Sequence, residues 1–135
     1  MKILIVDDSK LQRRMLQMIL EKAGYDSLQA ADGKEGLRMA REGMPDLILL
    51  DMMLPGLDGR AVLNELKSNP ATSPIPVIVL TGLSQKNEEK LLAAGAAAYF
   101  QKPELGLDKG APELLDLLRQ TLPGRRAIRS QGKSA

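Results

Sequence analysis

Short, continuous apolar runs alternate along the chain with longer segments whose apolar residues recur at helical spacing. Runs such as Ile3 to Val6 and Leu47 to Leu50 are typical of buried strands in a parallel sheet. The predicted strands cover residues 2–6, 25–30, 47–50, 77–80 and 97–101. Five strands interleaved with five helices predict an α/β fold, a doubly wound five-stranded parallel sheet with helices on both faces.

Residues that start and stop helices divide the remaining segments. Ser9 followed by Gln12 is typical of a capping box that opens the first helix, and Gly24 is expected to end that helix. The apolar stripe of this helix is expected to consist of Leu11, Met15, Met18, Ile19 and Ala23. The other helices are predicted from Gly33 to Glu42 with Gly43 as terminator, from Arg60 to Ser68, from Ser84 to Gly95, and from Pro112 onward.

Reactive side chains follow four of the five predicted strands. In chain order they are Asp7 and Asp8, then Asp51, then Thr81, then Lys102 before Pro103. Each alone is explained equally well as a turn residue, a helix cap or an exposed strand end. The carboxyl ends of parallel strands share one edge of the sheet, however, so we expect these side chains to converge on one crevice. Three carboxylates, a hydroxyl and an ammonium group suit a divalent cation beside a phosphoryl group.

Composition narrows the chemistry further. The 135 residues, 44% of them hydrophobic, suffice for one domain with an ordinary core. The chain has no cysteine and no histidine, which excludes disulfides, thiolate or imidazole metal sites and histidine-based triads. The remaining hard oxygen ligands favour Mg²⁺ or Ca²⁺. With neither a leader-like amino terminus nor a run of about 20 apolar residues, we expect a cytoplasmic protein with no membrane partner.

The formal charge of +2 is concentrated at the carboxyl terminus. Residues 124–135 contain four basic residues and no acidic one, which leaves 15 basic against 17 acidic residues in the rest of the chain. We therefore predict a domain over residues 1–123 and a basic, disordered tail over residues 124–135, and we expect no nucleic-acid partner.

The segments ILIVDDS, LILLDMMLPGLDG, VIVLTG and YFQKP together resemble a response-regulator receiver domain, similar to the single-domain chemotaxis-type regulators. The resemblance covers about residues 1–122 and implies a flavodoxin-like sheet of order 2-1-3-4-5. It implies that Asp51 accepts a phosphoryl group from a sensor histidine kinase or a phosphotransfer protein. It further implies that Asp8, Asp51 and the backbone carbonyl of Met53 hold Mg²⁺, with Asp7 contributing mainly through water.

The same resemblance assigns roles around the phosphoryl group. Thr81 and Lys102 are expected to bind its oxygens, and movement of the Thr81 hydroxyl is expected to let Tyr99 turn inward as a switch. Phe100 should point to the opposite face, into the core. Met53 and Leu83 should stand over the path of the hydrolytic water and slow self-dephosphorylation. The Lys102-Pro103 peptide bond is expected to be cis.

The resemblance also predicts a phosphoacceptor rather than an enzyme, which assists its own phosphorylation and dephosphorylation. Signalling is expected to pass through the face formed by the fourth helix, fifth strand and fifth helix. The segment from Glu104 to Gly110 makes the last loop longer than is usual in the family. The sequence leaves open the cognate kinase, the downstream target, the pathway, the role of this loop, and whether the chain is a monomer or a weak dimer.

Three alternatives compete with a stand-alone phosphorylation switch. A haloacid-dehalogenase-type phosphatase needs a second acid two residues after its aspartate, where this chain has Met53. A flavodoxin-like electron carrier needs a glycine- and hydroxyl-rich phosphate loop after the first strand, where this chain has Asp7, Asp8, Ser9 and Lys10. A receiver belonging to a longer regulator with an output domain is compatible with the sequence and stays open.

Overall fold

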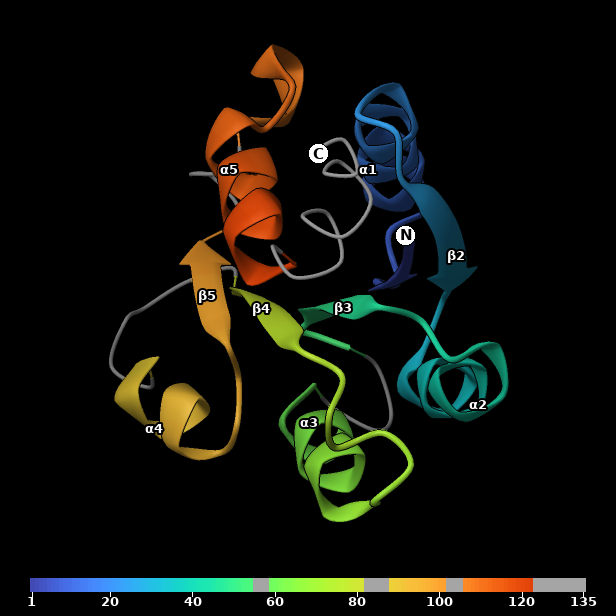
Figure 1. Cartoon of the computed structure of the whole chain (residues 1–135), viewed down its shortest axis with the longest axis vertical. Coiled ribbons are helices and arrows are strands. Elements are labelled where there is room, and N and C mark those ends of the chain that lie inside the picture. The colour runs from blue at the N-terminus through green and yellow to red at the C-terminus, as the bar shows by residue number, and fades with distance from the viewer. Residues whose placement is uncertain (55–58, 82–87, 102–105, 123–135) are drawn as a thin grey trace, which may run out of the picture.

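The computed structural model describes residues 1–54, 59–81, 88–101 and 106–122, and the chain alternates between strands and helices throughout (Figure 1). The strands are β1 (Lys2–Val6), β2 (Asp26–Ala30), β3 (Leu47–Asp51), β4 (Val77–Thr81) and β5 (Ala98–Gln101). The helices are α1 (Lys10–Lys22), α2 (Gly33–Gly43), α3 (Gly59–Ser68), α4 (Glu88–Ala93) and α5 (Pro112–Thr121), with a short 3-10 helix, η3 (Leu107–Lys109), before α5.

The strands form one parallel five-stranded sheet of order β2-β1-β3-β4-β5, which confirms the predicted fold and strand order. Helices α1 and α5 cover one face of the sheet, and α2, α3 and α4 cover the other (Figure 1). With helices on both faces, the central strands are shielded from water, and every residue of β3 is buried. The sheet is therefore a rigid platform whose carboxyl edge presents the predicted site.

Alternate residues of each strand feed two separate cores. Ile3 and Ile5 of β1 belong to the cluster under α1 and α5, where Leu16, Leu20, Leu114 and Leu118 are fully buried. Leu4 and Val6 belong to the cluster under the other three helices. Successive side chains of a strand point to opposite faces of the sheet, so this alternation determines which face each strand residue contacts.

The predicted apolar stripe of α1 is wrong. The side chains that α1 buries against the sheet are Leu16 and Leu20, whereas Leu11 and Met18 are 70% and 58% exposed. Ile19 packs against the buried cluster from its edge. Helix α1 therefore carries two apolar stripes, and the sequence pattern drew attention to the one that faces away from the core.

The predicted ends of the elements differ from the observed ones in small ways. Gly24 has φ +94 and follows α1, and Pro112 begins α5, as predicted. Gly43 instead belongs to α2, and the left-handed position after this helix is taken by Met44, with φ 45. Between β5 and α5, a segment expected to be a loop contains η3, flanked by Gly106 and Gly110 in left-handed conformations.

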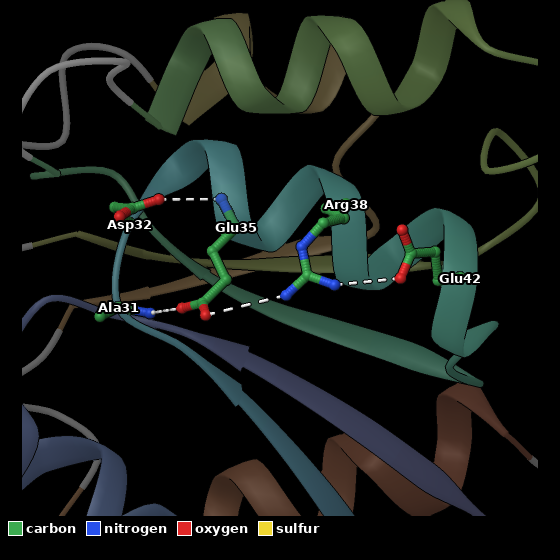
Figure 2. Close-up of polar contacts among 5 residues, drawn as sticks. All are labelled: Ala31, Asp32, Glu35, Arg38 and Glu42. Atoms are coloured by element: carbon green, nitrogen blue, oxygen red, sulfur yellow. Dashed lines mark hydrogen bonds and ion pairs between the residues drawn. The ribbon is translucent and has the colours of Figure 1, made fainter.

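The amino end of α2 shows how local side chains stabilise a helix start (Figure 2). The Asp32 carboxylate accepts a hydrogen bond of 2.8 Å from the Glu35 amide, and the Glu35 carboxylate accepts one of 2.9 Å from the Ala31 amide. Along the same exposed face, Arg38 lies 3.0 Å from Glu42 and 3.9 Å from Glu35. Exposed pairs of this kind contribute about 0.3–0.5 kcal/mol each, so they support the helix without positioning the site.

At the amino ends of the strands, charged side chains hold loops through backbone atoms. Lys67 Nζ donates to the carbonyl oxygens of Ser73 at 2.9 Å and Ile75 at 2.8 Å, and burial of this ammonium group lowers the pKa of Lys67. The Asp46 carboxylate accepts a hydrogen bond of 2.7 Å from the Lys2 amide. None of the helices in the described parts of the chain has the length and apolarity needed to cross a bilayer.

Candidate metal and phosphoryl site

Three carboxylates from two neighbouring strands meet at the carboxyl edge of the sheet. Asp51 is the last residue of β3, and Asp7 and Asp8 directly follow β1, which pairs with β3. One ligand atom from each of the three carboxylates lies within 4.8 Å of the others. The structure thus brings together three of the predicted site residues, although Asp51 is more than 40 positions away from the other two in the sequence.

The carboxylate and the backbone carbonyl of Asp7 are each held by a residue at the start of α1. Its carboxylate accepts a hydrogen bond of 2.8 Å from the Ser9 amide, and its backbone carbonyl accepts one of 2.6 Å from Arg13 Nη1. The Ser9 hydroxyl accepts a hydrogen bond of 3.2 Å from the Gln12 amide, so Ser9 caps α1 as predicted. In a full capping box the Gln12 side chain would accept a hydrogen bond from the Ser9 amide. Here the Ser9 amide donates to Asp7 instead, so this part of the predicted box is replaced by a contact to the site.

Asp51 is positioned by the turn that follows β3 and by the start of α3. Its carboxylate accepts a hydrogen bond of 2.9 Å from the Met53 amide. A Cβ atom at Gly59 would lie 2.6 Å from the Asp51 carbonyl oxygen and 2.5 Å from the Met52 Cα. Only glycine therefore allows α3 to begin this close to the strand end that carries Asp51.

Burial makes this cluster costly for the fold. Asp7 and Asp51 have no exposed surface, whereas Asp8 is exposed. Carboxylates of like charge at this spacing repel one another, and burial weakens the solvation that would offset the repulsion. A hard divalent cation would reverse that balance. Mg²⁺ in proteins is bound by oxygen ligands, usually one or two carboxylates together with several waters, and the three aspartates can supply such a set. The donor chemistry of the three aspartates therefore fits a metal ion.

Thr81 and Tyr99 lie on the same face of neighbouring strands. Thr81 pairs in register with Gln101, and Tyr99 is two residues earlier on β5, opposite Val79. The Thr81 hydroxyl donates a long hydrogen bond of 3.5 Å to the Phe100 carbonyl. Tyr99 is partly buried against the cluster under α2, α3 and α4. Phe100 packs against the opposite cluster, as expected, but remains partly exposed.

Two predicted site residues lie outside the described residues. They are Lys102, with the expected cis bond to Pro103, and Leu83. Met53, two positions after Asp51, is described and is 65% exposed. Sequence reasoning assigned no function to Arg13 or Gly59, although both contact the backbone of an aspartate of the site. The sequence carries no signal for the role of Gly59, because its close approach to Asp51 depends on the tertiary fold.

Comparison with known proteins places this site in a family. The model of the response regulator receiver domain matches residues 3–109. The response regulator PleD of Caulobacter vibrioides is 40% identical over 76% of this chain, which spans 23% of PleD. The polar-differentiation response regulator DivK of Brucella anthropi is 37% identical over 75% of this chain and 83% of its own length. A CheY-like receiver domain protein from Methanospirillum hungatei has a TM-score of 0.81 at 29% identity, covering 93% of this chain and 95% of that one.

The protein belongs to the response regulator receiver domain family. The family match covers β1, β3 and the three clustered aspartates, so the acidic pocket is consistent with the phosphorylation-based signalling of two-component systems. Such domains are phosphoacceptors that interact with histidine kinases. The resemblance noted in the sequence is confirmed.

Proposed function

We propose that this protein is a signalling switch in a phosphorelay, activated when Asp51 accepts a phosphoryl group. The observation that carries the proposal is the position of the Asp51 carboxylate, which is fully buried and grouped with Asp7 and Asp8 within 4.8 Å. A buried carboxylate beside two others is expensive to maintain and is typical of a reactive site rather than of a structural one. Asp51 is therefore the nucleophile, and the other two aspartates serve the metal.

The proposed donor is the phosphohistidine of a sensor histidine kinase or of a phosphotransfer protein. An Asp51 carboxylate oxygen attacks phosphorus, the phosphorus–nitrogen bond breaks, and the bonding electrons return to the imidazole, which takes up a proton. The product is an acyl phosphate on Asp51. The hydrogen bond of 2.9 Å from the Met53 amide holds one carboxylate oxygen in place, which restricts attack to a defined direction.

In this proposal Asp7, Asp8 and Asp51 hold Mg²⁺, together with the backbone carbonyl of Met53. When bound, Mg²⁺ neutralises negative charge that develops on the phosphoryl oxygens. The protein groups do the rest of the positioning, since the Ser9 amide and Arg13 fix the Asp7 carboxylate and carbonyl. Lys102 would donate to a phosphoryl oxygen from the loop after β5.

The proposed switch runs from Thr81 to Tyr99. The Thr81 hydroxyl now donates to the Phe100 carbonyl over 3.5 Å, a weak bond that a charged phosphoryl oxygen would outcompete. Movement of that hydroxyl toward Asp51 would leave space on the face that Tyr99 shares, so Tyr99 could turn further inward. Output would then pass through the α4, β5 and α5 face, where a shallow groove of about 270 Å³ is lined by Phe100, Glu113, Asp116 and Leu117.

The lengths of the relatives fit both a stand-alone receiver and a receiver within a longer regulator. The chain spans 23% of PleD and 50% of RpaA, a DNA-binding transcriptional regulator of Synechocystis, but 83% of DivK. The receiver could therefore act alone or precede an output domain in a longer regulator. Reading the gene beyond the codon for Ala135 distinguishes these arrangements, because only a longer regulator continues in frame.

The test of the proposed function is incubation with a small phosphodonor and Mg²⁺, followed by intact-mass measurement. We expect the wild type to gain one phosphoryl group and Asp51→Asn to gain none, because an amide is not a competent nucleophile. Asp26→Asn, which removes an exposed carboxylate from β2, is the matched control and should label like the wild type. Labelling of Asp51→Asn at the wild-type level would exclude Asp51 as the acceptor.

A further inference from the structure

Asp8 is the exposed member of the acidic cluster, and its carboxylate is not held by any described side chain. Asp7 and Asp51 are fully buried, and the carboxylate of each accepts a hydrogen bond from a backbone amide. The Asp8 carboxylate has no hydrogen-bond or ion-pair partner among the described residues. Its position therefore depends on the backbone on either side of it.

Both peptide groups that flank Asp8 are fixed by hydrogen bonds. The preceding one contains the Asp7 carbonyl oxygen, which accepts a hydrogen bond of 2.6 Å from Arg13 Nη1. The following one contains the Ser9 amide, which donates to the Asp7 carboxylate over 2.8 Å. A peptide group is planar, so holding one of its atoms restricts the whole plane, and two restricted planes leave the Asp8 Cα little freedom. The bond from Arg13 is the one that connects this backbone to the body of α1.

Arg13 is anchored in a helix that packing holds in place. It lies near the start of α1, whose Leu16 and Leu20 are fully buried in the core. Within the described residues, the Asp7 carbonyl is the one partner of the Arg13 guanidinium, so no ion pair accounts for its position. The guanidinium is planar and loses little conformational freedom for each hydrogen bond that it forms. Arg13 therefore connects the backbone of the acidic cluster to a rigid support.

We propose that Arg13 is a positioning residue that makes the acidic site favour Mg²⁺ over Ca²⁺. The inference rests on the metal-binding role proposed for the three aspartates. Mg²⁺ requires near-ideal octahedral geometry at short ligand distances, whereas Ca²⁺ accepts more ligands in irregular arrangements. Ligands that are held rigidly therefore favour Mg²⁺, and ligands that move freely lose that preference. By holding the peptide group before Asp8, Arg13 limits how far this carboxylate moves relative to those of Asp7 and Asp51.

The charge and the hydrogen bond of Arg13 act in opposite directions on metal affinity. A guanidinium beside the acidic cluster repels Mg²⁺ and Ca²⁺ to a similar extent, because both ions carry the same charge. Losing the charge should therefore strengthen the binding of both ions, whereas losing the hydrogen bond should weaken the binding of Mg²⁺ more than that of Ca²⁺. The ratio of the Ca²⁺ dissociation constant to the Mg²⁺ dissociation constant cancels the effect of charge and isolates that of the hydrogen bond.

The test is titration of the metal-free protein with Mg²⁺ and, separately, with Ca²⁺, followed through the amide signals of Asp8 and Met53 without a phosphodonor. We expect Arg13→Met to lower the ratio about tenfold, which is typical of losing a group that orients a metal ligand. Arg14→Met is the matched control, because Arg14 is the next residue of α1, exposed and without a partner among the described residues. It removes the same charge and should leave the ratio unchanged within about twofold.

Arg13→Lys tests whether the hydrogen-bond donor itself is responsible. A flexible ammonium group then replaces the planar guanidinium, so the ratio should lie between those of the wild type and Arg13→Met. An Arg13→Lys ratio as low as that of Arg13→Met would show that the donor is not the cause. If Arg13→Met does not fold, Arg13→Lys decides alone, and a ratio equal to that of the wild type then overturns the proposal.

The outcomes separate this inference from the proposed function. If the wild type bound neither ion, the metal site itself would be excluded, and with it the role of Arg13. If the wild type bound both ions and Arg13→Met kept the wild-type ratio, only the role of Arg13 would be excluded. An equal fall of the ratio in Arg13→Met and Arg14→Met would also overturn the proposal, because Arg14 forms no bond to the site.

Discussion

At the amino ends of the strands, charged side chains bind backbone atoms, whereas at the carboxyl ends of β1 and β3 three carboxylates are grouped together. Lys67 donates to two carbonyl oxygens of the loop before β4, and Asp46 accepts from the Lys2 amide. At the other end, the ligand atoms of Asp7, Asp8 and Asp51 lie within 4.8 Å of one another. Charged side chains therefore stabilise the folded state at the amino ends of the strands. At the carboxyl ends, the grouped carboxylates destabilise it.

This difference separates structural charges from functional ones. A charge that bonds the backbone stabilises a loop whatever else the protein does, so its removal should lower stability and leave signalling unchanged. Like charges that lie close together are retained only where binding of a ligand compensates for their repulsion. Their removal should abolish ligand binding at no cost to the stability of the metal-free protein.

The largest expected effect is on the metal site. Asp8→Ala should lower Mg²⁺ affinity roughly a hundredfold, about 2.7 kcal/mol, because it removes one of three carboxylates. Phosphorylation at a fixed, low Mg²⁺ concentration should fall with it. Without metal, the melting temperature should stay the same or rise, since the repulsion on Asp7 and Asp51 is relieved. Titration calorimetry and thermal unfolding measure these quantities.

Asp26→Ala is the control for the metal site, because it removes an exposed carboxylate from β2 at the amino end of the sheet. This variant should bind Mg²⁺ as the wild type does. If Asp8→Ala destabilised the metal-free protein by more than about 1 kcal/mol, the carboxylate would be structural, and the contrast between the two ends would fail.

The next largest effect is expected at the opposite end. Lys67→Met keeps much of the aliphatic chain that packs beside Gly95 but leaves the Ser73 and Ile75 carbonyls without their donor. Losing these bonds should lower the free energy of unfolding by about 1–3 kcal/mol. The extent of phosphorylation at saturating Mg²⁺ should not change. Urea unfolding checks the first statement and intact mass the second.

Lys34→Met, on the exposed face of α2, is the matched control for Lys67→Met and should alter stability by less than about 0.5 kcal/mol. A Lys67→Met variant that is as stable as the wild type but phosphorylated more slowly would show that Lys67 has a functional role rather than a structural one.

The strand pattern predicted most of the fold and the grouping of the three aspartates. The five apolar runs lie within one residue of the observed strands, because burial on both faces of a parallel sheet leaves little freedom in composition. Parallel pairing then brings Asp7, Asp8 and Asp51 together without any further information. The position of these aspartates at a common edge follows from the topology of a parallel sheet alone, so the sequence is enough to predict it.

What the pattern missed depends on contacts between distant segments. On α1, several apolar residues share helical spacing, and only packing decides that Leu16 and Leu20 face the sheet while Met18 faces water. The need for glycine at position 59 has no signal in the sequence, because the backbone of Asp51 that excludes a Cβ there belongs to another element. The 3-10 helix η3 is too short for a periodic signal, although its flanking Gly106 and Gly110 mark both of its ends.

A smaller effect concerns the lifetime of the phosphorylated state at the carboxyl end. Met53 is exposed beside the site, and neither its side chain nor that of Leu83, which lies outside the described residues, can orient a water molecule. Met53→Asn with Leu83→Glu should therefore accelerate self-dephosphorylation roughly tenfold, about 1.4 kcal/mol of barrier. Decay of the phosphorylated mass at constant Mg²⁺ measures the rate.

For this double variant, Met44→Asn is a control that introduces the same amide far from the site. Equal decay rates in the wild type and the double variant would mean that water access at these positions does not determine the lifetime. The comparison between the two ends would then rest on metal binding alone.

The smallest effect is expected for residues 124–135, whose charges are predicted to be neither structural nor functional. Residues 124–135 carry four basic side chains but only Ala127 and Ile128 as apolar residues before the terminal Ala135. Ordering a backbone residue costs about 1–2 kcal/mol, which this little apolar surface cannot offset, so the tail should contribute nothing to the stability of the domain. A chain ending at Pro123 should melt within about 3 °C of the full chain, which corresponds to roughly 1 kcal/mol or less, and should be phosphorylated to the same extent. A larger loss of melting temperature at low protein concentration would show that the basic residues are structural charges like Lys67, bound to the acidic surface of the domain, and the difference between the two chains would then widen as salt is removed.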